Sequence, residues 1–311
     1  MKLHTHKILK YLKIAKSKKP TTFKHICREC LETPFPRAIH TGMQQSHFHE
    51  MGQRRFGSVN WGGVATLYYK EILRSVKVPA QTFAAPVITA LLFLFIFSYA
   101  FGASRPSIGD IPLTEFLIPG LAMMALMQNA FACSSSSLLI SKMMGITSDF
   151  LMPPLSPGEL AVGFVGGATT RGVAVATCVI IGVWLFHTVE IKHLWAVLYF
   201  ALGGSLMLGQ MGLLAGIWSG KFDHLQSVTN FVIMPLSFLS GTFYPIHVLP
   251  PAGQTVSLSN PFFYLIDGFR YGFLGYHESN LLGGVILIAG INVALWLLCY
   301  RALRSGWRLK T

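Results

Sequence analysis

Residues 79–101 read PAQTFAAPVITALLFLFIFSYAF, and this stretch decides the fold class. It carries no charged residue and is long enough to cross the hydrocarbon core of a bilayer as a helix. A backbone in lipid must pair its N–H and C=O groups internally, and the stretch lacks the alternation of a barrel strand. Further apolar stretches follow at residues 116–139, 161–186, 194–218, 225–247 and 281–300. The sequence therefore predicts an all-α polytopic membrane protein with six transmembrane helices.

Composition and charge favour the same class. The mean hydropathy is +0.52, and 12% of the residues are charged, whereas soluble domains have roughly 25%. Residues 1–60 hold 12 of the 25 Lys and Arg but only three Glu. We therefore expect residues 1–58 to be a basic, disordered cytoplasmic N-terminal extension, and residues 59–311 to be the transmembrane domain. Membrane lipid is an expected partner, and nucleic acid is not.

Metal binding is not expected. Cys27 and Cys30 form a C-x-x-C pair, but a structural zinc site needs four ligands, and the nearby histidines supply no recognisable second pair.

The distribution of Lys and Arg predicts the orientation. These residues crowd the segment before the first stretch and the tail after the last one. Cytoplasmic flanks of membrane spans carry an excess of Lys and Arg. Both termini are therefore expected in the cytoplasm, which an even number of spans allows.

Residues 61–78, just before the first span, have the pattern of an amphipathic helix. Apolar residues recur at spacings of three and four, with Lys70, Glu71 and Arg74 between them. Such a helix lies along a membrane surface with its apolar stripe toward lipid or protein. We predict an N-terminal interface helix, which would be either a juxtamembrane anchor or a mechanical element.

Residues 140–160 are predicted to form the longest inner loop between spans. Apolar side chains are frequent in it, and Asp149, Phe150 and Leu151 stand at its centre. Exposed apolar surface of this extent marks an interaction site. Either a cytoplasmic partner subunit or the chain's own helices would cover it.

Residues 245–280 should lie outside, yet prolines and aromatic residues take the place of charges. The segment is too broken to span and too apolar for water, which predicts a re-entrant helical hairpin between spans five and six. Within it, Asp267 and Arg270 are three residues apart and would share a helix face. We expect them to form a structural ion pair and not to act in catalysis.

Polar residues inside the spans are candidates for function because a charge in lipid costs about 2.5 kcal/mol or more. The main ones are Gln128, Asn129 and Arg171. Arg171 is expected either to extend its head group to the interface, to form an ion pair, or to contact cargo. Asn129 could equally form a hydrogen bond between helices.

The hairpin segment resembles a known family. Asn260-Pro261, then Tyr264, then Arg270 within GFRYGFLG resembles the C-terminal signature of ABC-2-type transporter permeases. The similarity covers roughly residues 61–311. Further matches follow in the expected order: Lys70-Glu71 in the interface helix, Ile118-Pro119-Gly120-Leu121, Gly166-Gly167, Arg171-Gly172, Phe222-Asp223 and Pro235-Leu236.

The resemblance implies a transmembrane permease subunit in a bacterial inner membrane. Two copies, expected as a homodimer, would sit on a separate cytoplasmic ABC ATPase that drives export of an amphiphilic, lipid-linked, glycan or drug-like substrate. Lys70 and Glu71, together with Asp149 to Leu151, would couple the permease to that ATPase. This chain would then hold no cofactor and have no enzyme activity, because ATP and Mg²⁺ would bind the partner subunit.

The residues agree with this separation. A phosphate-binding loop of the form G-x-x-x-x-G-K-[ST] cradles the nucleotide, and the nearest approach runs from Gly216 to Gly220-Lys221-Phe222. It has three intervening residues where four are needed, and Phe222 where a hydroxyl belongs.

A six-span secondary transporter that works without ATP is the alternative. It would carry acidic or His residues in mid-span for coupling ions, or inverted halves with matching broken helices. The central portions of the spans contain no Asp or Glu, and only the C-terminal half has a broken segment. The permease of an ATP-driven exporter, which the resemblance implies, is therefore preferred over a secondary transporter.

Overall fold

The computed structural model describes residues 59–100, 107–108, 111–147, 155–186, 190–306 and 308. All of them belong to one compact unit, Phe56–Thr311. The expected N-terminal extension, residues 1–58, lies outside the described residues, and so do Asp149, Phe150 and Leu151.

Among the described residues, five helices are long and apolar enough to cross a membrane. They confirm the all-helical, polytopic class. Their bounds as candidate spans are Ala80–Tyr99, Leu113–Met143, Pro157–Trp184, Leu194–Trp218 and Leu281–Ser305. The first joins a π-helical turn, η2 (Ala80–Ala84), to α4 (Ala85–Ala100); the others are α5, α7, α8 and α13.

The span expected over residues 225–247 is not one of these five helices. Its place is taken by α9 (Phe222–Val228), a second π-helical turn η3 (Thr229–Ile233) and α10 (Met234–Leu239). The predicted end at residue 247 was wrong, because Gly241 takes a left-handed conformation with φ +72°. The buried Ser237 carbonyl there accepts a hydrogen bond from Thr242 Oγ1 at 2.8 Å and so holds the turn.

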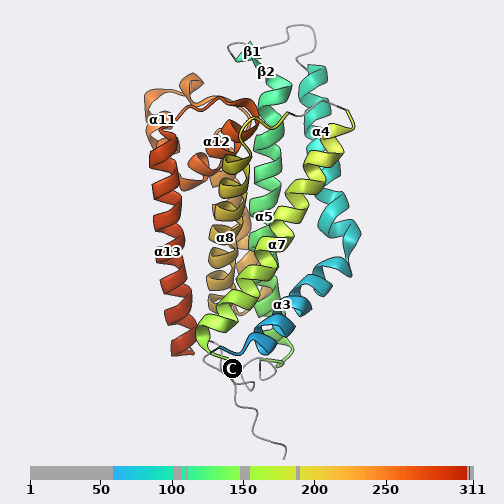
Figure 1. The fold of residues 1–311 in the computed structure, drawn as a ribbon, viewed down its shortest axis with the longest axis vertical. Helices are drawn as coiled ribbons and strands as arrows, with labels where there is room; N and C mark the ends of the chain where they lie inside the picture. Colours follow the sequence, from blue (N-terminus) through green and yellow to red (C-terminus); the bar gives the residue numbers. More distant parts are fainter. Residues whose placement is uncertain are drawn as a thin grey trace, which may run out of the picture. The chain divides into compact units, whose positions relative to one another are not determined.

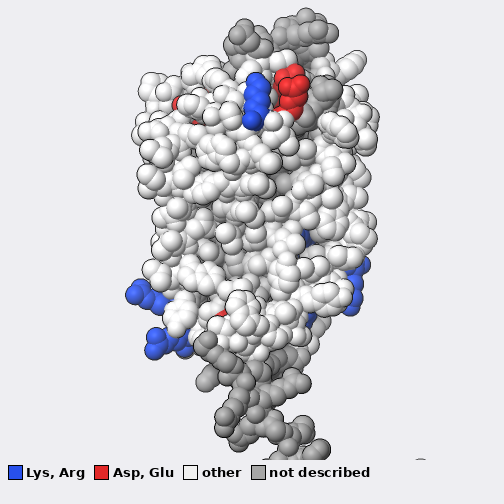
Figure 2. Space-filling view, in the orientation of Figure 1, with Lys and Arg blue, Asp and Glu red and all other residues white. Residues whose placement is uncertain are grey.

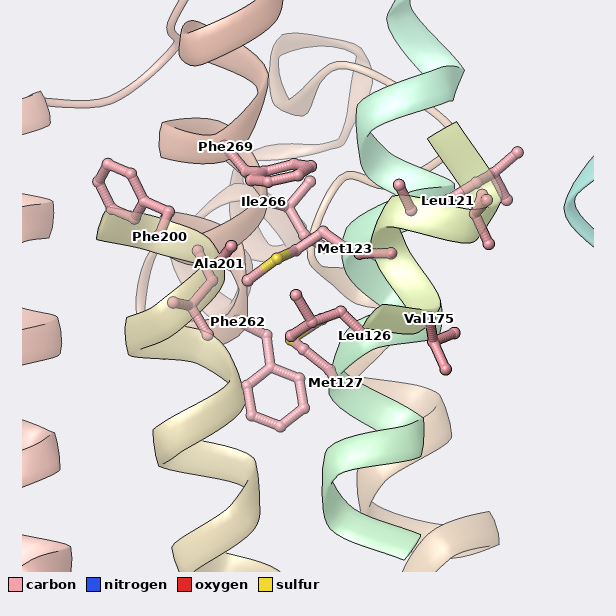
Figure 3. Packing of buried hydrophobic residues seen from close by; sticks show 14 of the residues in the cluster. Leu121, Met123, Leu126, Met127, Val175, Phe200, Ala201, Phe262, Ile266 and Phe269 are labelled. Atoms are coloured by element: carbon pink, nitrogen blue, oxygen red, sulfur yellow. The ribbon is translucent and has the colours of Figure 1, made fainter. Parts of the chain in front are cut away.

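Helix α5 is the centre of the fold. Its most apolar window is 78% buried inside the protein, against 17% for the first span and 11% for α13. It packs between α7 and α8 and also contacts α12 (Figure 1). Figure 3 shows Met123, Leu126 and Met127 of α5 beside Phe262 of α12, in one buried cluster that also includes Phe200 of α8. The outer helices are left to face lipid or other subunits.

Close helix contacts in this core depend on glycine. Gly212 of α8 lies against the Phe131 carbonyl and the Ser134 side chain of α5, so close that a Cβ would overlap both. Ser134 Oγ donates to the Gly209 carbonyl at 2.7 Å in the same crossing. Small residues at crossings let helix backbones approach without a steric penalty.

The two ends of the helix bundle differ. At one end lie β1 (Ser107–Ile108), β2 (Ile111–Pro112) and two short helices, α11 (Pro251–Leu258) and α12 (Pro261–Leu274), preceded by the turn η4 (Ile246–Val248) (Figure 1). At the other end lie α3 (Trp61–Val76) and the end of α13. Figure 2 shows Lys and Arg gathered at the α3 end, below a broad band without charge.

Candidate functional site

Helix α3 occupies the range predicted for the interface helix, and its packing explains its sequence. Its buried residues, Val64, Leu67, Glu71 and Ser75, follow a spacing of three or four and form one face. This face lies on a glycine surface of α7. A Cβ added to Gly163 would stand 2.5 Å from a Leu67 methyl group, and one added to Gly167 would stand 2.5 Å from Glu71 Cβ.

A single carboxylate joins the starts of α3 and α7. Glu159 Oε1 accepts the backbone N–H of Asn60 at 2.7 Å, and its Oε2 accepts the N–H of Ser156 at 2.7 Å. Asn60 in turn caps α3 by accepting from Gly63 N at 3.0 Å. Ser156 and Glu159 form a capping box at the start of α7. The first turns of the two helices are therefore held together.

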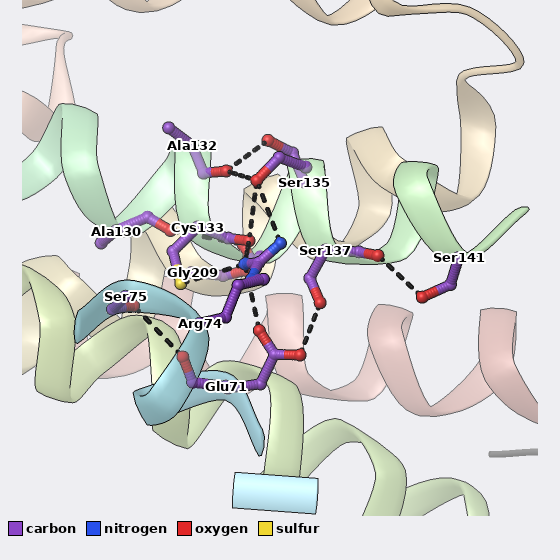
Figure 4. A network of polar contacts seen from close by, with 12 residues as sticks. Glu71, Arg74, Ser75, Ala130, Ala132, Cys133, Ser135, Ser137, Ser141 and Gly209 are labelled. Atoms are coloured by element: carbon purple, nitrogen blue, oxygen red, sulfur yellow. Dashed lines mark hydrogen bonds and ion pairs between the residues drawn. The ribbon is translucent and has the colours of Figure 1, made fainter. Parts of the chain in front are cut away.

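The middle of α3 is tied to α5 by hydrogen bonds that involve both residues of an ion pair within α3 (Figure 4). Glu71 is 1% exposed, and its Oε2 lies 3.0 Å from Arg74 Nη2. Its Oε1 accepts from Ser137 Oγ of α5 at 2.5 Å. Arg74 Nη2 also donates to the Cys133 carbonyl at 2.6 Å. Glu71 was predicted as a site residue from the sequence, whereas Arg74 and Ser137 were not, although the i,i+3 spacing of Glu71 and Arg74 indicated a possible pair.

Lys70, the other residue of α3 chosen from the sequence, is exposed. The remaining coupling candidates, Asp149 to Leu151, lie outside the described residues. Before them, at the end of α5, Met143 and Met144 are 56% and 68% exposed. Lys142 is instead buried and donates to the carbonyls of Ile217 and Ser219 at 2.8 and 2.7 Å. The chain thus presents apolar side chains at the same end of the bundle as α3.

A groove of about 250 Å³ runs between the first span and α5. It is lined by Gln81, Thr89, Phe93, Leu121, Gln128 and Asn129, among others. Arg171 of α7 donates to Asn129 Oδ1 at 3.3 Å. The structure thus brings together all three polar residues that the sequence selected inside the spans. Within the described residues Arg171 makes no ion pair, so of the three alternatives expected for it this one is not observed there.

At the other end, the polar residues of the hairpin segment are buried. Asp267 accepts the N–H groups of Glu278 and Ser279, both at 2.9 Å. Arg270 donates to the Gly241 carbonyl at 2.7 Å and lies 3.6 Å over the Phe116 ring. The predicted ion pair between Asp267 and Arg270 is therefore not formed, because each binds a different part of the chain. Burial raises the pKa of the Glu278 carboxyl, which accepts the Ile246 N–H at 2.7 Å.

Asn260 and its neighbours join α10 to α12. The Asn260 side chain caps α12 by accepting from Phe262 N at 3.0 Å, and its Nδ2 donates to the Leu236 carbonyl at 2.8 Å. Pro261 is the first residue of α12, where a missing N–H costs nothing. Tyr264 packs on Gly284 of α13.

Replacing Asn260 by alanine should remove both the cap and the tether to α10. We expect the free energy of unfolding to fall by about 2 kcal/mol, because a buried cap and a buried carbonyl both lose their partner. Thermal unfolding of the purified chain in detergent measures it. Asn280→Ala is the matched control, since Asn280 caps α13 but is exposed and makes one bond, to Gly283 N. An equal loss in both variants would contradict the tether.

Comparison with known proteins agrees with these features. Residues 63–274 match the ABC-2 type transporter family. The chain is 32% identical over 252 residues to the inner membrane transport permease YadH of Escherichia coli K12, covering 81% of this chain and 98% of that protein. It is 24% identical over 228 residues to nodulation protein J of Rhizobium leguminosarum bv. viciae, covering 72% of this chain and 86% of that one. The chain therefore belongs to the ABC-2 type transporter family, as a multi-pass permease of the inner membrane.

Proposed function

We propose that this chain is the transmembrane half of an ATP-driven exporter. A separate cytoplasmic ABC ATPase subunit would bind ATP and Mg²⁺, and a second copy of the permease would complete the path. The substrate would be an amphiphilic, lipid-linked, glycan or drug-like molecule moved outward. Family membership implies the ATPase partner, and the attachment of α3 to α5 and α7 is the observation that carries the coupling.

The proposed topology has six crossings with both termini in the cytoplasm. The broken run α9–η3–α10 would be the fifth crossing. It begins beside the end of α8, and it ends at the hairpin helices, where Ser257 Oγ donates to the Leu239 carbonyl at 2.9 Å. The helices α11 and α12 would form the re-entrant element. The charge distribution supports this orientation, because Lys and Arg gather at the α3 end.

In this arrangement α3 would lie on the inner membrane surface, and conformational changes of the ATPase would displace it. Because α3 is fixed to α7 by Glu159 and to α5 by Glu71 and Arg74, it cannot move alone. A displacement would pass to the two central helices as a rigid-body movement. Met143 and Met144, with Asp149, Phe150 and Leu151 that follow in the sequence, would provide the second contact with the ATPase.

The decisive experiment is affinity purification of the tagged chain in mild detergent, followed by mass spectrometry and an ATPase assay. We expect a nucleotide-binding subunit to co-purify. An Asp149→Lys, Phe150→Ala double variant should reduce its recovery about tenfold, since it reverses a charge and removes an apolar contact.

Glu190→Lys, an exposed charge reversal between α7 and α8, is the matched control and should leave recovery unchanged. A chain that purifies alone and supports transport in liposomes without ATP would contradict the proposal. The secondary transporter would then be the better account.

A further inference from the structure

The groove between the first span and α5 is graded in polarity along its length. Because α4 and α5 run in opposite directions, Gln81 at the start of the span lies level with Gln128 and Asn129. Phe93 and Leu121 line the opposite part. The polar part is on the α3 side, since Arg74 of α3 contacts Cys133, one turn beyond Asn129. A molecule lying in the groove would therefore meet polar groups near α3 and apolar groups deeper in.

The polar part of the groove has buried donors without acceptors in it and beside it. Gln128, which lines the groove, and Arg171, which adjoins it through Asn129, each have a buried side-chain nitrogen, Nε2 and Nε respectively, with no partner among the described residues. Arg171 Nη2 donates a hydrogen bond to Asn129 Oδ1, and no carboxylate of the described residues lies within ion-pair distance of Arg171. The residues that line the groove include no Asp or Glu. A buried donor without an acceptor is satisfied by an oxygen atom, and a cation without a counter-ion by an anion, so an anionic group with several oxygens would satisfy both.

We infer that this groove binds the phosphate-bearing headgroup of an inner-leaflet amphiphile, with Arg171 as its cation and Gln128 as a hydrogen-bond donor. The lipid chains would follow Phe93 and Leu121 toward the middle of the bilayer. Arg171 lies at the depth of α3, as a headgroup at the inner surface requires, because the hydroxyl of the adjacent Thr170 is hydrogen-bonded to the Tyr68 hydroxyl of α3 at 2.7 Å. That the bound amphiphile is the transported substrate rests on the proposed function. The inference then narrows that substrate to an anionic amphiphile.

Lipid binding to the full chain tests the inference. The chain in mild detergent is titrated with dioleoylphosphatidylglycerol or dioleoylphosphatidylcholine, and bound lipid is counted by native mass spectrometry. We expect at least one phosphatidylglycerol to bind about tenfold more tightly than phosphatidylcholine, because both carry the same phosphate but the choline cation offsets its charge and is repelled by Arg171. Arg171→Gln should abolish this preference, whereas Arg171→Lys should retain most of it.

Arg301→Gln is the control, because Arg301 is an exposed cation of α13, away from the groove, and its loss should leave the preference intact. If Arg171→Gln does not fold, Gln128→Leu tests the same site and should weaken phosphatidylglycerol binding several-fold. An unchanged preference in the groove variants would overturn the inference. Release of the lipid by millimolar inorganic phosphate would overturn the assignment to an amphiphile and indicate a free anion. This assay needs no ATPase, so its failure and the failure of ATPase co-purification are separate results.

Discussion

Replacing Gly212 by alanine is expected to lower the free energy of unfolding by about 3 kcal/mol, because the methyl group overpacks the crossing of α5 and α8. The added Cβ would overlap the Phe131 carbonyl oxygen and Ser134 Oγ. The carbonyl is backbone in α5, whose apolar window is the most buried among the five candidate spans, and it cannot turn aside as a side chain would. The two helices would have to separate, which would also stretch the bond from Ser134 to Gly209.

Thermal unfolding in detergent, followed by circular dichroism, measures this change. Gly290→Ala is the matched control, since Gly290 lies in α13 with no atom within 4 Å of an added Cβ. There the substitution should be neutral or stabilise by about 0.5–1 kcal/mol, through the better helix propensity of alanine. Equal melting temperatures for the two variants would show that the α5–α8 crossing is looser than described.

The second large effect is expected at the ion pair of α3. Arg74→Leu would leave the Glu71 carboxylate, which is 1% exposed, without its cation. Breaking a buried pair from one side costs about 3–5 kcal/mol, and the partial exposure of Arg74 places the loss near the lower figure. The Cys133 carbonyl would lose its partner at the same time. The melting temperature should fall, and ATP-driven activity of the assembled complex should fall with it.

The double variant Glu71→Leu, Arg74→Leu separates charge from packing. It removes both ions, and such apolar replacements are often neutral for stability. We expect the melting temperature to recover most of its loss while coupling to the ATPase stays impaired, because the bond from Ser137 to α3 is gone. A double variant as unstable as Arg74→Leu would mean that the ion pair does not account for the loss.

Hydrophobicity predicted most of the fold. The long helices start and end within five residues of their predicted limits, and the differences have local causes. Helix α7 begins at Pro157 because Ser156 and Glu159 cap it, and α13 continues to Ser305 until Gly306 turns left-handed with φ +63°. The helix over residues 222–239 was placed less well. The sequence stays apolar after Leu239, so hydropathy predicts that the helix continues. The helix ends there because Gly241 forms a left-handed turn, which hydropathy cannot detect.

The site was predicted in part. Periodicity indicated that α3 has a buried face, but it did not show that Glu71 belongs to that face. A carboxylate is normally expected on the solvent-exposed face of a helix, and only the contacts with Ser137 and Arg74 make the burial of Glu71 favourable. The sequence also could not predict the hydrogen bond between Arg171 and Asn129, because it depends on how α5 and α7 are rotated about their axes. For Asp267 and Arg270, spacing along one helix suggested a pair, while tertiary contacts gave each another partner.

The π-helical turns η2 and η3 have a consequence for the alignment of sequence with structure. Each adds about one residue to a run that is otherwise α-helical. Deleting one residue from Thr229–Ile233 would restore regular α-helical geometry and leave the faces of α9 and α10 nearly unchanged, because five π-helical residues turn through about the same angle as four α-helical ones. Deleting one residue from α9 or α10 itself would instead rotate one half by about 100° relative to the other. A gap of one residue within Thr229–Ile233 therefore preserves the helix faces, whereas the same gap outside it changes which side meets lipid.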